Sequence, residues 1–183
     1  MRRATPAEEG PIRAAMAAHA VVVREVFVLP GAAAAAWAPV RGRMRVREGF
    51  LCAPAWRRAA IIAHEAGHVR LRHLPRCVAL AATTEAALLA ARVALAPALL
   101  SGPLAFGLGT AGILAGEVAV WASVSWLMRI QEYAADRWAV RDGGVTGGEY
   151  VEHLRQVGHP AARGPLDRLI ETHPTPAQRI RRI

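Results

Sequence analysis

Residues 61–73 read IIAHEAGHVRLRH, and two histidines in this stretch, His64 and His68, stand four positions apart. Four positions on an α-helix are just over one turn, so both imidazoles lie on one face and can reach the same ion. Glu65 follows His64 directly and lies beside that face. Its carboxylate can therefore contact a water molecule on the ion without binding the ion itself, which is the position of a general base.

The residues around this stretch favour a helix. From 54 to about 74, apolar residues and the two histidines recur at intervals of mostly three and four, with arginines between them. We therefore predict a metal-binding helix over 54–76. The H-E-x-x-H pattern is typical of zinc metallopeptidases, but a five-residue pattern with two free positions also arises by chance. A third ligand from another element is needed.

Composition limits the classes of protein that fit. The 183 residues suit one domain with a real core. The formal net charge of +9 comes from 23 arginines and no lysine, and together with abundant alanine this indicates codon bias as much as selected chemistry. The arginines are scattered, aromatic residues are few and no nucleic-acid motif is present, so we expect no nucleic-acid partner.

The cysteines and the N-terminal residues indicate the cellular compartment of the protein. Cys52 and Cys77 are far apart and have no metal-ligand spacing with the histidines, which predicts neither a disulfide framework nor a cysteine-based zinc site. A reducing compartment fits best. Charged residues interrupt the first 20 positions, where a signal peptide needs an apolar run, so we predict no cleaved export sequence.

The segment 1–53 is predicted to contain two or three antiparallel strands. Residues 21–29 and 43–51 are β-branched or alternating, and 32–40 fits either a strand or a short helix. Met44 and Val46 alternate with arginines, the pattern of a sheet with one face in water.

Residues 77–128 form two apolar regions separated by Ser101-Gly102-Pro103, and each is long enough to cross a bilayer. Glu85, Arg92 and Glu117 interrupt them, and a charge at mid-membrane costs roughly 2.5–3.5 kcal/mol. Glu85 and Arg92 are seven positions apart, hence on one helical face that can point at a partner helix. We expect a transmembrane hairpin, with a buried or peripheral helical hairpin as the alternative.

Arginines flank this hairpin on both sides, whereas its turn carries no charge. The positive-inside rule then places both flanks in the cytoplasm. We therefore expect a protein of the inner cell membrane with its catalytic face cytoplasmic and with membrane lipid as one partner. The spacing of Gly112 and Gly116 allows close helix approach and leaves a homo-oligomer open.

The third ligand is predicted directly after the hairpin, where residues 129–140 read RIQEYAADRWAV. Glu132 and Asp136 share a helical face. We assign Glu132 as the third zinc ligand, because two imidazoles and a carboxylate leave a fourth position for water in a catalytic site with one Zn²⁺. Asp136 can accept the free ring N–H of a ligating histidine. The alternative is a solvated face ion-paired with Arg129, which fails to explain why an HExxH helix precedes it.

Three stretches together carry a family resemblance: AHEAGHVRLRH, QEYAADRWAV and THPTPAQRIRRI, in that order. The chain resembles the M48 family of zinc metallopeptidases, the group of HtpX-like and CAAX-prenyl-protease-like enzymes. The M56 receptor-type peptidases resemble it too, but fit the C-terminal stretch less well. The M48 resemblance implies zinc held by His64, His68 and Glu132 and catalysis by Glu65. It also implies an H-P element whose histidine, His173, sits near the site.

His173 is our candidate donor to the oxyanion of peptide hydrolysis, against the alternative that His173-Pro174 merely begins the terminal helix. His73, five positions from His68, misses the helical register by one. We therefore interpret it as a surface or interfacial histidine near the helix end.

The resulting expectation is a single α+β, mostly α metallopeptidase domain over 1–183. It comprises N-terminal strands (1–53), a zincin-type metal helix (54–76), an apolar hairpin inserted between the ligands (77–128), and a third-ligand helix with C-terminal helices (129–183). The expected function is membrane-associated zinc metalloendopeptidase acting on peptide or protein substrates through a zinc-activated water. Two alternatives stay open: a catalytically inactive metal-binding regulatory or scaffold protein on the same fold, and a soluble nucleic-acid-binding module with an incidental HExxH.

Overall fold

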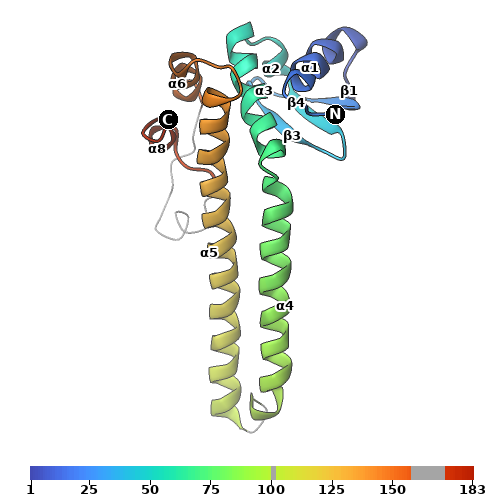
Figure 1. The fold of residues 1–183 in the computed structure, drawn as a ribbon. Coiled ribbons are helices and arrows are strands. Elements are labelled where there is room, and N and C mark those ends of the chain that lie inside the picture. Colours follow the sequence, from blue (N-terminus) through green and yellow to red (C-terminus); the bar gives the residue numbers. More distant parts are fainter. Residues whose placement is uncertain (100–101, 158–171) are drawn as a thin grey trace. The chain divides into compact units, whose positions relative to one another are not determined.

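A computed structural model describes residues 1–99, 102–157 and 172–183. The chain divides into two units. The first contains Met1–His73, the residues of helix α5 from Ile130 onward, and helices α6 and α8. The second contains Leu74–Arg129 and the described residues 172–173. The described part of the chain is mostly helical with one small sheet (Figure 1), which confirms the predicted fold class.

The sheet of the first unit has four strands in the order β1-β2-β4-β3. Strand β1 (Arg2–Arg3) pairs antiparallel with β2 (Glu25–Leu29), and β3 (Ala36–Val40) pairs antiparallel with β4 (Arg43–Arg47). Residues 36–40, left open between strand and helix by the sequence, are thus a strand.

One pairing corrects the expectation of an antiparallel sheet: β2 and β4 are parallel, with Glu25 opposite Arg43 and Leu29 opposite Arg47. The reason is the connection after β2, which takes the chain to the outer edge of the sheet, where β3 begins. Arg41 and Gly42 both have positive φ, 52° and 79°, as a tight two-residue hairpin turn requires, and this turn returns the chain as β4 between β3 and β2.

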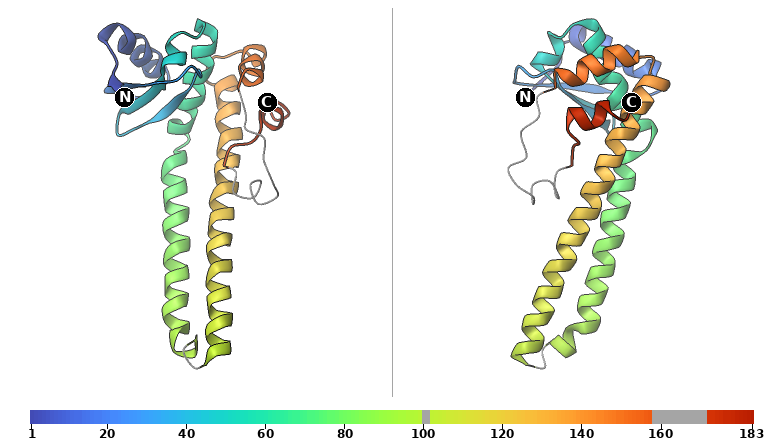
Figure 2. Two further views of the ribbon diagram at one scale, coloured as in Figure 1. Left: turned by 180° about the vertical axis from the view of Figure 1, so that it is seen from behind. Right: turned by 90° about the vertical axis from the view of Figure 1, so that its left-hand side faces the viewer.

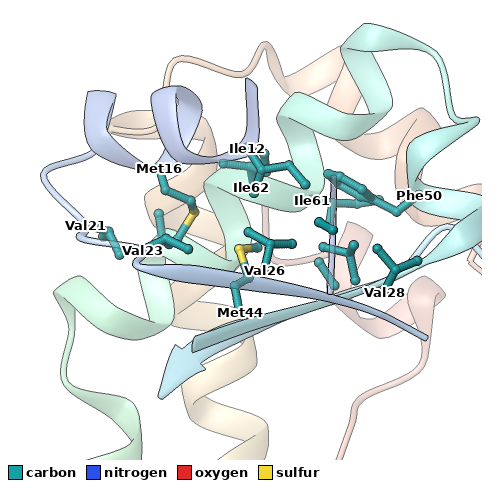
Figure 3. Close-up of a cluster of buried hydrophobic side chains, with 14 residues drawn as sticks. Ile12, Met16, Val21, Val23, Val26, Val28, Met44, Phe50, Ile61 and Ile62 are labelled. Carbon is teal, nitrogen blue, oxygen red and sulfur yellow. The ribbon is translucent and has the colours of Figure 1, made fainter. Parts of the chain in front are cut away.

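One face of this sheet is buried under two helices. Val26 and Val28 of β2 and Met44 and Val46 of β4 point into the core, while Arg43 and Arg45 between them are exposed, so the predicted wet face is present. The covering helices are α1 (Pro6–Ala18), which begins with a Thr5–Glu8 capping box, and α3 (Ala55–Arg70). Figure 3 shows Ile12 and Met16 of α1 and Ile61 and Ile62 of α3 meeting the strand residues. Each fully buried apolar side chain stabilises the fold by about 1.5–3 kcal/mol.

Helix α3 is packed on a second side as well. Its Ala60 and Ala63 join Ala139 of α5 (Pro103–Arg141), together with Val145 and residues of α6 (Gly147–Arg155), in a second apolar cluster. Ile180 of α8 (Pro176–Ile180) packs against this cluster. Helix α3 thus lies between the sheet on one side and α5 and α6 on the other, which brings two distant parts of the sequence together.

Gly67, inside the HEAGH stretch, allows a close approach of α3 to α5. A Cβ atom at Gly67 would lie 3.2 Å from the Ala135 Cα and 3.2 Å from the Trp138 ring. Ala135 belongs to the same helix as Glu132. Any larger residue at Gly67 therefore pushes the candidate carboxylate ligand away from the histidines.

We expect Gly67→Val to lower the free energy of unfolding of the first unit by about 1–3 kcal/mol, because overpacking two helices forces a backbone shift. The matched control is Gly10→Val, since a Cβ at Gly10 meets nothing within 4 Å; it should change stability by less than about 0.5 kcal/mol. Thermal unfolding in detergent measures both. Equal midpoints for the two variants would contradict the close packing of α3 on α5.

The second unit is a helical hairpin. Helix α4 (His73–Leu99) and the part of α5 up to Arg129 run antiparallel, side by side in both views of Figure 2. Arg92 of α4 donates to Glu117 of α5, forming an ion pair between the two helices. Gly116 of α5 also lies against the Leu88 side chain. The predicted inward-facing charge at Arg92 thus has its partner on the opposite helix, whereas Glu85 is exposed.

Helix boundaries differ in two places from the predicted segments. The helix that carries the HEAGH stretch ends at Arg70, not near 76, and short α2 (Glu48–Leu51) closes the segment predicted as the second strand. Helix α5 continues without a break from the apolar region through Glu132 to Arg141. The apolar segment and the predicted third-ligand segment are therefore one helix.

Candidate metal centre

Two turns of α3 and one turn of α5 bring three potential ligands together in the first unit. His64 and His68 come from α3 and Glu132 from α5, and one ligand atom of each lies within 4.8 Å of the other two. The His64 Nε2 atom is 3.0 Å from the His68 Nε2 atom. The Glu132 Oε2 atom is 3.4 Å from the His64 Nε2 atom, and the Glu132 Oε1 atom is 3.4 Å from the His68 Nε2 atom.

The donor set fits a catalytic metal ion. Two imidazole nitrogens and one carboxylate oxygen are the ligands that zinc takes when a fourth position stays open to water. His64 and Glu132 are buried, and His68 is partly buried. Burying several ligand atoms with lone pairs close together costs free energy, unless a cation or bound protons compensate their negative charge.

Asp136 lies one turn beyond Glu132 on α5 and faces the other nitrogen of His64. Its Oδ1 atom is 3.0 Å from the His64 Nδ1 atom. This is the geometry in which a carboxylate accepts the N–H of a ligating histidine and fixes its orientation. Asp136 is 1% exposed, so its charge must be balanced by neighbours.

Two residues from distant helices stabilise that charge, Arg179 as an ion pair and Tyr150 as a hydrogen-bond donor, and the sequence had not pointed to either. Arg179 of α8 donates to Asp136 with two nitrogens, Nε to Oδ2 at 2.8 Å and Nη2 to Oδ1 at 2.5 Å. The Tyr150 hydroxyl of α6 donates to Asp136 Oδ1 at 2.8 Å and lies 2.9 Å from His64 Nδ1. Arg179 Nη1 also lies 3.4 Å from the Glu132 carboxylate. Both residues therefore help to hold the candidate ligands and Asp136 in position without being ligands themselves.

These contacts shift the protonation equilibria of the cluster. Burial would raise the pKa of Asp136, but hydrogen bonds that its carboxylate accepts from Arg179 and His64 lower it to about 2. Burial and the charge of Arg179 would lower the pKa of His64, but its hydrogen bonds to Asp136 and Glu132 raise it to about 10. At neutral pH and without a cation, His64 is therefore protonated. A metal ion that binds His64 must displace this proton, so its affinity falls as the pH falls below about 10.

Glu65 lies on α3 beside the ligand face, next to strand β3. Burial raises the pKa of its carboxyl group, against the opposing effects of His64 and His68 and of a hydrogen bond with the Ala38 backbone. A raised pKa brings a carboxylate closer to the range in which it exchanges protons with water at neutral pH. Its neighbours and its placement suit a general base.

His73 corrects a prediction. The sequence interpretation made it a surface or interfacial histidine, but it is 3% exposed and its Nδ1 atom lies 2.8 Å from the His68 Nδ1 atom. The interpretation assumed an unbroken helix to 76. The helix instead ends at Arg70, and Arg72 has a left-handed φ of 55°, which redirects residue 73 toward His68.

The remaining predicted site residue, His173, is exposed and groups with the second unit. Its proposed donation to the oxyanion stays a prediction. The structure thus brings Glu65, Asp136, His64, His68 and Glu132 together in the first unit.

The comparison with known families agrees with this geometry. Residues 25–183 match the sequence model described as peptidase family M48. The match covers the sheet strands from β2 onward, the HEAGH helix, α5 and the C-terminal helices, which is most of the chain. The chain belongs to peptidase family M48, a family of metal-dependent peptidases, and the resemblance predicted from its motifs is confirmed. Searches of curated proteins and of solved structures gave no match.

Proposed function

We propose that this protein is a membrane-associated zinc metalloendopeptidase in which His64, His68 and Glu132 hold one Zn²⁺ and Glu65 is the general base. The observation that carries the proposal is the convergence of these three ligand atoms within 4.8 Å of one another. A bound zinc ion would polarise the scissile carbonyl and lower the pKa of the attacking water.

Glu65 supplies the proton transfers. Its carboxylate takes a proton from the water as the water oxygen forms a bond to the carbonyl carbon. When the C–N bond breaks, the same group gives that proton to the leaving amine nitrogen. The raised pKa of Glu65 supports this double role, since the group must both accept and release a proton.

Strand β3 suits the binding of an extended peptide substrate. It lies at one edge of the sheet, and Trp37 and Val40 on it are exposed. Its Ala38 backbone interacts with Glu65, so the strand borders the catalytic carboxylate. A peptide added as a further strand would pass beside the metal centre with its main chain fixed by hydrogen bonds.

The second unit supports membrane association. Two helical segments, His73–Pro97 and Phe106–Arg141, are long and apolar enough to cross a bilayer, and in an apolar 18-residue window of each, 0% and 6% of the residues are buried. Large apolar side chains on both helices are exposed, among them Val93 and Trp121. Pairing Arg92 with Glu117 lowers the cost of placing these charges in lipid. With the arginine-rich flanks, we propose insertion into the inner membrane from the cytoplasmic side.

The test is metal-dependent hydrolysis by the full chain in detergent. Removing metal with a chelator should abolish cleavage of an unfolded protein substrate, and adding Zn²⁺ should restore it. His64→Ala and Glu132→Ala should lose both bound zinc and cleavage, because a site with two protein ligands binds zinc much more weakly. Cleavage that survives complete metal removal would overturn the proposal.

The competing function, an inactive metal-binding scaffold on the same fold, predicts bound zinc but no hydrolysis under any of these conditions. Salt-sensitive DNA binding by detergent-free protein would instead favour the nucleic-acid module.

A further inference from the structure

His73 is placed beside His68 by a break in the helix. In a continuous helix, a residue five positions after His68 would point about 140° away from it. Here α3 ends at Arg70, the Leu71 N–H caps it by donating to the Gly67 carbonyl, and Arg72 takes a left-handed φ of 55°. A left-handed conformation strains the backbone at a residue with a Cβ. The fold carries this strain at the position that redirects His73.

The placement of His73 is fixed from two sides. Its ring packs edge-on against the His68 ring, with ring centroids 4.8 Å apart and the Nδ1 atoms 2.8 Å apart. Its backbone carbonyl accepts a hydrogen bond from the Gln131 side chain at 3.2 Å. Gln131 directly precedes Glu132 in α5. His73 is thereby tied both to a histidine ligand and to the helix of the carboxylate ligand.

The chemistry of His68 assigns a role to this contact. Its Nε2 atom faces His64 and Glu132, so Nε2 is the nitrogen that would bind the metal. A neutral imidazole that offers the Nε2 lone pair carries its proton on Nδ1, where it can donate a hydrogen bond. The atom in hydrogen-bond range of His68 Nδ1 is the His73 Nδ1 atom, which accepts when its own proton is on Nε2.

We propose that His73 is a positioning residue that accepts a hydrogen bond from the His68 Nδ1–H and so fixes the tautomer and ring orientation of this ligand. The proposal rests on the metal site of the proposed function and deepens it. The two histidine ligands then have different outer partners: His64 faces the charged Asp136–Arg179 pair, whereas His68 faces a neutral ring. Such outer partners typically contribute 10–100-fold to metal affinity.

The first experiment measures Zn²⁺ affinity of the full chain in detergent by competition with a chelator. His73→Leu should bind Zn²⁺ about 10–100-fold more weakly than the unmodified protein. His73→Asn should recover most of this loss, because the Asn Oδ1 atom can occupy the position of the ring Nδ1 and accept the same hydrogen bond. His19→Asn is the matched control, since His19 packs against Trp138 and not against a ligand; it should bind as the unmodified protein does.

The second experiment needs no substitution. In ¹⁵N-histidine NMR spectra of the zinc-loaded protein, His68 should show its proton on Nδ1, with a scalar coupling across the hydrogen bond to the His73 Nδ1 nitrogen. Absence of that coupling, or unchanged Zn²⁺ affinity in His73→Leu, would overturn the role of His73. If the unmodified protein itself binds no Zn²⁺, the proposed function fails instead, so the two failures are distinguishable.

Discussion

Replacing Glu65 by glutamine should lower the rate of peptide hydrolysis by roughly 10²–10⁴-fold, because the amide cannot take a proton from the attacking water. The bound zinc should be retained, since Glu65 lies beside the ligand face and is outside the group of three converging ligands. The measurement is kcat on an unfolded protein substrate, together with metal content of the same preparation.

The matched control is Glu152→Gln, a change of the same kind on α6 at a side chain that is 47% exposed and pairs with Arg155. It should leave kcat and metal content unchanged. If Glu65→Gln hydrolyses substrate as fast as the unmodified protein, Glu65 is not the base. If both proteins bind zinc and neither hydrolyses anything, the scaffold alternative is correct.

The second large effect is expected at Arg179. Its guanidinium makes two hydrogen bonds to Asp136, and its side chain is only 12% exposed. Arg179→Met leaves the buried Asp136 carboxylate without its main counter-charge, which should cost about 3–5 kcal/mol of folding free energy. Thermal unfolding of the metal-free protein in detergent measures this loss. Arg181→Met, at an exposed arginine two positions further on, is the control and should have little effect.

The pH dependence checks the cause. The folded pKa of Asp136, about 2, lies below its ordinary value of 3.8, so the Arg179 contact stabilises the fold above pH 3.8 and this contribution is lost as the pH falls toward 2. The stability difference between the unmodified protein and Arg179→Met should therefore be largest at neutral pH and shrink below pH 4. A difference that is independent of pH would mean that Arg179 acts through packing and not through its charge.

The local parts of the site could be predicted because the helix repeat fixes them. His64 and His68, and likewise Glu132 and Asp136, are spaced four positions apart, and this spacing is enough to place each pair on one face. The alternation of Met44 and Val46 with arginines gave the buried side of strand β4 in the same way. No knowledge of the tertiary fold was needed for any of these.

The partners of the ligands depend on tertiary contacts and were missed for that reason. Arg179 lies 43 positions after Asp136, and no local pattern links the two. Tyr150 had a weak signal: it falls on the apolar face of a helix that begins with a capping box at Thr146, and a buried tyrosine hydroxyl needs a polar partner. His73 was misplaced because an arginine in a left-handed conformation, which favours glycine, gives no warning in the sequence. The parallel pairing of β2 with β4 likewise depends on a crossover and not on either strand's own residues.

The central claim is that one cation is held by two imidazoles of α3 and one carboxylate of α5. X-ray absorption spectroscopy of the zinc-loaded full chain in detergent tests it most directly. We predict one zinc ion per chain with only nitrogen and oxygen neighbours at about 2.0–2.2 Å, two of them imidazoles. His68→Ala removes one imidazole ligand and should therefore weaken the outer-shell scattering that comes from the imidazole rings. A first shell that contains sulfur from Cys52 or Cys77, or one that His68→Ala leaves unchanged, would contradict the account.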